Sequence, residues 1–176
     1  MSEWQTGAEV AAQIFLSAEV YHASSGLLGA EGTRDKPQFF FASITCAAFA
    51  AELYLKALIA AEQETFKAVY EHDLWELFNK NIKSQETKQK IRDLYNSRTT
   101  TLQQAILQST GVKRDFDAVI QFGKDAFELM RYSFEPGQRD HGWDGNGIIN
   151  AIRDVALELQ PTWPVPNGAR PTFPAR

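Results

Sequence analysis

Five side chains could assemble a site for a negatively charged ligand, although they lie in separate parts of the chain. Glu52 and Lys56 are four residues apart in a strongly helical stretch, so they share one helix face in the order that favours an ion pair. His72, Asp73 and Arg131 complete the candidate set, and a helical bundle could bring His72 and Arg131 close to the first two. One interpretation is a nucleotide or phosphate pocket in which Lys56 and Arg131 meet the negative charge. The other is a partly buried ion-pair network that fixes helix order, with Asp73 capping its own helix.

Other kinds of chemistry lack the residues that they need. The sequence contains no His-Glu-x-x-His, no pair of cysteines and no calcium loop with its terminal glutamate, so we expect no metal and no cofactor. Gly142, Gly145 and Gly147 follow no predicted strand, which argues against a dinucleotide-binding loop. Cys46 lies in an apolar stretch, and we expect it to be a small buried hydrophobe.

The composition is that of a soluble globular protein. With 176 residues, the chain is long enough for one domain with its own core. A net charge of −4 argues against a general nucleic-acid binder. The first residues lack the basic region and apolar core of a signal peptide, so we expect a cytoplasmic protein.

One apolar helix, expected from about Pro37 to Gln63, is the element around which the others must be arranged. Apolar side chains occupy nearly every face of its first half, which predicts a helix surrounded by other helices. The helix is long enough to cross a membrane. However, Glu52 and Lys56 would each cost about 2.5–3.5 kcal/mol near the bilayer centre. We therefore expect a core helix and no membrane contact.

Helical spacing predicts three further main helices. The first begins near Thr6 and ends between Gly26 and Gly29, where two glycines provide a stop. The other two span Asp115–Phe134 and Ile148–Leu159. Shorter helices are expected at residues 73–79, 84–94 and 102–108.

Two segments differ from the rest in composition. Residues 80–98 are rich in Lys and Arg, and we expect a solvated helix face there, with contact to RNA as the alternative. Residues 161–176 contain five prolines, which predicts an extended tail. No stretch alternates with period two. The sequence therefore predicts an all-α protein in which residues 1–160 form one helical domain and residues 161–176 form the tail.

Two segments resemble the HEPN superfamily: Ala-Glu-Leu-Tyr-Leu-Lys-Ala-Leu-Ile at 51–59 and His-Asp-Leu-Trp-Glu-Leu-Phe at 72–78. Arg131 and Tyr132 also look like the Arg-Tyr of a late helix in many members. The resemblance covers about residues 8–159. It implies an antiparallel four-helix bundle that forms a homodimer. It also implies a nucleotide, RNA or a protein from an adjacent gene as partner, in prokaryotic toxin–antitoxin or phage-defence modules.

Many HEPN proteins are metal-independent ribonucleases in which a His follows an Arg after four to six residues. Here His141 follows Arg139 by two residues and Arg131 by ten. Such a His could move a proton of the reacting RNA, while an Arg stabilises the charge on phosphorus. Because this spacing departs from the family pattern, we expect a non-catalytic HEPN-like binding domain. The alternative is a divergent ribonuclease site at Arg131, Arg139 and His141. The residues that the resemblance implies for ligand binding are Glu52, Lys56, His72, Asp73, Arg131 and Tyr132.

Overall fold

The computed structural model describes residues 6–32, 36, 38–98, 115–123 and 145–166. Within these residues the only β feature is an isolated bridge between Thr6 and Thr65. The elements are, in chain order, α1 (Gly7–Gly32), α2 (Gln38–Ala61), α3 (Leu74–Glu76), the π-helix η1 (Leu77–Asn81), α4 (Gln85–Ser97), α6 (Phe116–Phe122) and α8 (Gly145–Leu159). The prediction of an all-α protein is confirmed for the described part of the chain.

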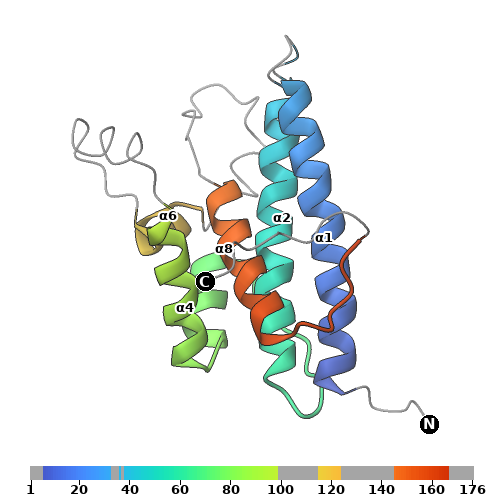
Figure 1. Cartoon of the computed structure of the whole chain (residues 1–176), viewed down its shortest axis with the longest axis vertical. Helices are drawn as coiled ribbons and strands as arrows, with labels where there is room; N and C mark the ends of the chain where they lie inside the picture. Colours follow the sequence, from blue (N-terminus) through green and yellow to red (C-terminus); the bar gives the residue numbers. More distant parts are fainter. Residues whose placement is uncertain (1–5, 33–35, 37, 99–114, 124–144, 167–176) are drawn as a thin grey trace.

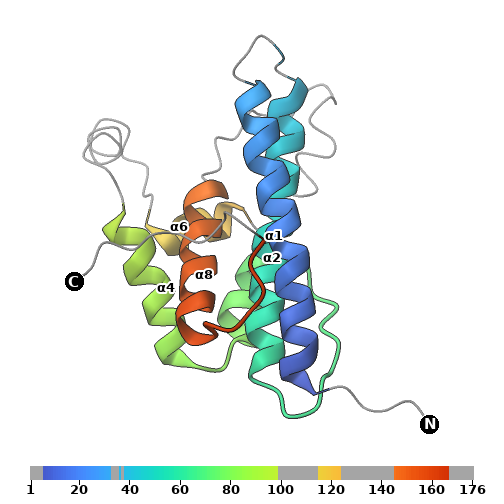
Figure 2. The same cartoon turned by 45° about the vertical axis from the view of Figure 1, so that its right-hand side comes forward.

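The two longest helices, α1 and α2, form an antiparallel hairpin, and the shorter helices pack against one end of it (Figure 1, Figure 2). α8 contacts α2, and α4 packs on α8. The ion pairs Lys90–Glu158 and Arg98–Asp154 show that α4 and α8 run in opposite directions. The end of the hairpin where α1 stops and α2 begins projects beyond α8 in both views.

Polar side chains cap the starts of the helices. Thr6 and Glu9 form a capping box, because the backbone N–H of each residue donates to the side-chain oxygen of the other, at 3.0 and 3.3 Å. Ser84 and Asp115 cap α4 and α6 by accepting a backbone N–H three residues later. Asp73 caps α3 in the same way, so the cap predicted there is confirmed.

α1 continues through the two glycines where we expected it to end. It runs to Gly32. At Gly29 the backbone of α1 comes close to α2, since a Cβ atom added there would lie 3.1 Å from the Oγ of Ser43. The predicted stop between Gly26 and Gly29 is therefore wrong. A glycine inside a helix can serve close packing as well as a helix end.

Other predicted boundaries also differ from the structure. α8 begins at Gly145 rather than at Ile148. α6 occupies the start of the helix predicted for residues 115–134, and Gly123 caps its C-terminal end. The helix predicted at 73–79 is present as α3 and η1. Residues 102–108 and 124–134 lie outside the described part.

The core is centred on the second half of α2. Tyr54, Leu55 and Ala57 are fully buried there, whereas Phe40 in the first half is 47% exposed. The first half was predicted to be enclosed by other helices, and among the described residues it is the less covered half. α2 is also the one described helix that is long and apolar enough to cross a membrane, and 67% of that stretch is buried inside the protein. A core helix has this degree of burial.

The first residues of the Pro-rich tail are part of the packed domain. Trp163 is 5% exposed, and its ring centroid lies 4.8 Å from that of Phe15 in α1. Val165 also packs against the core. The expectation of a tail separate from the domain is therefore corrected for residues 161–166. Prolines prevent a helix there, but the indole ring of Trp163 can still cover the core. Residues 167–176 lie outside the described part.

Two glycines of α1 should respond in opposite ways to the same substitution. A Cβ atom at Gly7 would lie 2.2 Å from the carbonyl oxygen of Ala60 and 2.1 Å from that of Gln63. We expect Gly7→Ala to lower the free energy of unfolding by about 1–3 kcal/mol, since backbone atoms must move apart. At Gly26 a Cβ atom would meet nothing within 4 Å. Gly26→Ala should therefore raise stability by about 1 kcal/mol through helix propensity.

Urea unfolding of both variants beside the wild type measures these changes. A change of the same sign at the two positions would contradict the close approach of the start of α1 to the end of α2.

Candidate functional site

The structure brings together three of the residues predicted to form a site. Lys56 Nζ lies 2.8 Å from Glu52 Oε1, as the helical spacing predicts. His72 Nδ1 lies 3.0 Å from the same oxygen, although His72 belongs to the segment between α2 and α3. Asp73 does not join this cluster through its side chain, which is engaged in capping α3.

The contacts of this cluster are internal to the protein. The Glu52 side chain is 10% exposed and that of Lys56 is 15% exposed. Because water reaches these two charges poorly, each stabilises the other as its counter-ion. The His72 side chain is 74% exposed and reaches Glu52 from the solvent side. The arrangement therefore holds the segment before α3 onto α2. It has the character of the ion-pair network that was one of our two interpretations.

The remaining predicted site residues, Arg131, Tyr132, Arg139 and His141, lie outside the described part of the chain. The ribonuclease hypothesis and the contribution of Arg131 to a phosphate pocket both depend on them. They stay predictions.

The basic segment at residues 80–98 is not uniformly solvated. Lys88 is 6% exposed, and its Nζ donates to the backbone carbonyl of Asn79 at the end of η1, at 3.0 Å. Lys90 Nζ lies 3.1 Å from a carboxylate oxygen of Glu158. Arg92 makes a two-bond contact with Asp117, at 2.9 and 3.2 Å. The expectation of a solvated face is wrong for Lys88, because its long side chain turns back to satisfy a helix end.

A second polar cluster, which we did not predict, lies inside the domain where α1, α2 and α8 meet. Arg153 donates to both carboxylate oxygens of Glu19, at 2.5 and 2.9 Å. The Tyr54 hydroxyl donates to Glu19 Oε1 at 2.5 Å. Glu19, Tyr54 and Arg153 are 4%, 0% and 5% exposed. Asp154, also buried, lies 3.6 Å from Arg153 and accepts at 2.7 Å from Arg98, the residue that caps the end of α4, so one polar network connects α1, α2, α8 and the end of α4.

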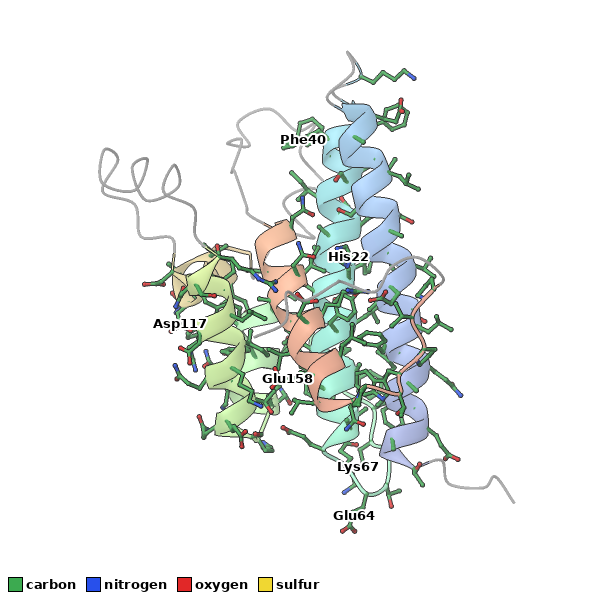
Figure 3. All side chains as sticks on the ribbon, in the orientation of Figure 1. His22, Phe40, Glu64, Lys67, Asp117 and Glu158 are labelled. Carbon is green, nitrogen blue, oxygen red and sulfur yellow. The ribbon has the colours of Figure 1, made fainter. Side chains whose placement is uncertain are left out.

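His22 lies at the end of this network, at mid-height of the hairpin (Figure 3). Its Nδ1 is 3.1 Å from the Tyr54 hydroxyl oxygen. That hydroxyl donates its proton to Glu19, so Nδ1–H of His22 is the donor in this contact and Nε2 carries the lone pair. Burial lowers the pKa of His22, and the positive charge of Arg153 lowers this pKa further. The imidazole is therefore neutral near pH 7.

The electrostatics of the network favour one protonation state. Burial raises the pKa of the Tyr54 hydroxyl, and its hydrogen bond to the Glu19 carboxylate raises it further. Tyr54 thus stays protonated and acts as a donor. In the described part, the carboxylate, the guanidinium and the phenol of this cluster bond to one another. The cluster therefore serves to hold α1, α2 and α8 together.

One signal in the sequence points to this cluster. Glu19 occupies a helical position between Phe15 and His22 on the inward face of α1, where an apolar residue is normal. Arg153 and Asp154 interrupt the apolar residues of the last helix in the same way. Charged residues at core positions require partners of opposite charge.

A hollow of about 440 Å³ opens between the upper parts of α1 and α2 and the first residues of α8. Its lining residues are mostly small: Ser25, Gly26, Gly29, Ala30, Phe40, Ser43, Ile44, Ala47, Gly145 and Asn146. The hydroxyl of Ser43 donates to the carbonyl oxygen of Ser25 at 2.8 Å, and the two hydroxyl oxygens are 3.3 Å apart. The serine hydroxyls therefore serve the contact between the two helices.

Within the described residues, no group of three or more His, Cys, Asp and Glu side chains could hold a metal ion. Cys46 is half-buried rather than fully buried, and desolvation raises the pKa of its thiol. Comparison with protein-family models, with curated proteins and with solved structures finds no match to this chain.

Proposed function

We propose that this chain is a non-catalytic, HEPN-like helical module that binds a protein partner, in the manner of a subunit of a toxin–antitoxin or phage-defence system. The observation that carries the proposal is the surface of the projecting end of the hairpin. We call this part the hairpin arm, and it comprises residues 20–30 of α1 and 38–51 of α2.

The hairpin arm is apolar and carries no formal charge. Its sequence contains no Asp, Glu, Lys or Arg, and an ion pair between Glu31 and Lys36 lies at the tip. Seven large apolar side chains are exposed in the described part of the chain, and four of them belong to the arm: Val20, Tyr21, Leu27 and Phe40. Surfaces with aromatic and aliphatic side chains and few charges are typical of the centres of protein interfaces.

The same geometry favours a protein over RNA or a nucleotide. RNA binding draws on cationic side chains that are free to meet phosphates. In the described part, Lys56, Lys90 and Arg92 contact carboxylates, and Lys88 is buried. A pocket at Lys56 would have to displace its ion pair with Glu52.

The helix directions support the HEPN-like part of the proposal. α1, α2, α4 and α8 alternate in direction along the chain, which is the up-and-down order of a four-helix bundle. The two segments that carry the resemblance, residues 51–59 and 72–78, touch through the contact of Glu52 with His72.

Cross-linking in a lysate of the source cells, followed by mass spectrometry, tests the proposal with two charge variants. Leu27→Asp places a charge on the arm at a side chain that is 73% exposed. Tyr70→Asp is the matched control, because Tyr70 is 85% exposed and lies away from the arm. We expect a protein that is cross-linked to the wild type and to Tyr70→Asp, and at least tenfold less to Leu27→Asp, since burying an unpaired carboxylate opposes binding.

Two further measurements distinguish the competing functions. If the wild type cleaves mixed RNA without metal and His141→Ala does not, the protein is a ribonuclease and the proposal of a non-catalytic module is wrong. A nucleotide that raises the melting temperature of the wild type, but not that of Lys56→Ala, would replace it by a nucleotide pocket.

A further inference from the structure

The charges of the buried polar network between α1, α2 and α8 are balanced. Arg153 donates to both oxygens of Glu19, one of which also accepts from the Tyr54 hydroxyl. The two oxygens of Asp154 meet Arg98 at 2.7 Å and Arg153 at 3.6 Å. In the described part of the chain, the two carboxylates of this network are therefore already engaged by two guanidinium groups.

His22 is the member of this network that can change its charge near neutral pH. Its Nδ1–H donates to the Tyr54 hydroxyl, so a further proton can bind only at Nε2. The side chain is half-buried, and within the described residues its direct hydrogen bond is to Tyr54 and not to a carboxylate. A protonated His22 would therefore have no counter-ion of its own.

We propose that His22 is a pH-sensitive switch: when its imidazole gains a proton, α8 loosens from the hairpin of α1 and α2. The protonated ring is a third cation beside two anions that two arginines already engage. Water screens charges poorly in a half-buried place, so this cation repels Arg153 of α8. The inference goes beyond the proposed function, because it concerns the response of the domain to acid and not the partner that it binds.

The charged groups that face His22 from α1 and α8 have opposite effects on its pKa. Burial lowers this pKa, and the positive charge of Arg153 lowers it further. The negative charges of Glu19 and Asp154 raise it. Tyr54 of α2 stays protonated and adds no charge. Because the lowering effects prevail, the folded domain binds this proton less readily than the unfolded chain does.

This difference sets the pH range in which the switch acts. The pKa of a histidine in an unfolded chain is about 6.5. Well above this value His22 is neutral in both states, so its protonation does not affect stability. Below this value the unfolded chain gains the proton first, so stability falls as the pH falls toward the lower pKa of the folded domain.

The hollow between the hairpin and the start of α8 lies next to this switch. Ser25 and Gly26 line the hollow and follow His22 by three and four residues, so they share its face of α1. Asn146, which also lines the hollow, precedes Arg153 by about two turns of α8. The repulsion therefore acts on α8 beside the hollow, and we expect the first turns of α8 to separate before the rest of the domain.

Urea unfolding at about pH 7.5 and about pH 5 tests the inference with His22→Gln. Glutamine keeps an N–H donor for Tyr54 and takes up no proton in this range. On acidification, the unfolding equilibrium constant should rise about tenfold more for the wild type than for His22→Gln, as one unit of pKa difference predicts. An equal rise in both proteins overturns the inference.

His72→Gln is the matched control, because the His72 side chain is 74% exposed and contacts Glu52 instead of the buried network. Its unfolding equilibrium constant should rise on acidification at least as much as that of the wild type. A smaller rise would assign the acid response to His72 and overturn the inference.

Two NMR measurements locate the switch. In a titration of the wild type, which needs no variant, the His22 ring should have a lower pKa than the His72 ring; an equal or higher pKa overturns the inference. Hydrogen exchange at about pH 5 should be about tenfold faster for the first turns of α8 in the wild type than in His22→Gln. A difference of the same size in every helix would mean that the whole domain unfolds and that α8 does not move separately, which also overturns the inference.

Discussion

Replacement of Arg153 by methionine is expected to lower the free energy of unfolding by about 3–5 kcal/mol, because it leaves the buried Glu19 carboxylate without its cation. Glu19 is 4% exposed, and both of its oxygens accept from Arg153. The Tyr54 hydroxyl would remain as a donor, but it supplies no positive charge. Urea unfolding of the variant beside the wild type measures the loss.

The double variant Glu19→Leu with Arg153→Met provides the control. Since both charges are gone, most of the lost stability should return, as it does when a buried pair is replaced by apolar side chains. Lys90→Met removes a cation from the exposed ion pair with Glu158 and should change stability much less. If the free energy of unfolding of Arg153→Met lies within about 1 kcal/mol of that of the wild type, the contact between Glu19 and Arg153 is not a buried ion pair.

Trp163→Ala is expected to cost about 3–5 kcal/mol, the usual loss when a large buried aromatic side chain is truncated. The indole ring covers Phe15, which is itself fully buried and lies 5.3 Å from the ring of Tyr54. The substitution would open the core between α1 and α2 to water, although Trp163 lies after the last helix.

Thr162→Ala is the matched control, since Thr162 is an exposed neighbour in the same segment. It should leave the urea midpoint unchanged. If Trp163→Ala also leaves the midpoint unchanged, the segment at residues 161–166 does not contribute to the core, and the simple tail that we predicted from its prolines would be the correct description.

The parts of the fold that depend on neighbouring residues could be predicted from the sequence. The all-α class, the cap at Asp73 and the Glu52–Lys56 ion pair depend on side chains at most four residues apart, whose relative positions a helix determines. The central position of α2 follows from its apolar length in the same way. The contact of His72 with Glu52 was expected only as one that a helical bundle could bring about, because the two residues are 20 positions apart in the chain.

The errors arose where the environment of a residue decides its role. In the sequence, Gly29 looks like the end of a helix. In the structure it lies beside Ser43, where the absence of a side chain lets α1 and α2 approach each other closely. Lys88 has the sequence signature of a solvated cation, yet it satisfies the end of η1 from inside the domain. Proline predicts an extended segment after α8 and gives no information on whether Trp163 packs against Phe15.

By itself, the sequence determined the helical class, most helix starts and the local ion pair, because hydrogen bonds and side-chain contacts within one helix extend over only a few residues. The tertiary structure alone decided which charged side chains meet in the core. Glu19 and Arg153 are 134 residues apart in the chain, and no local pattern specifies that α8 places one guanidinium against one carboxylate of α1. The tertiary structure also decided which apolar face of α1 is covered, since α2 packs on one face and leaves Leu16, Val20 and Leu27 exposed.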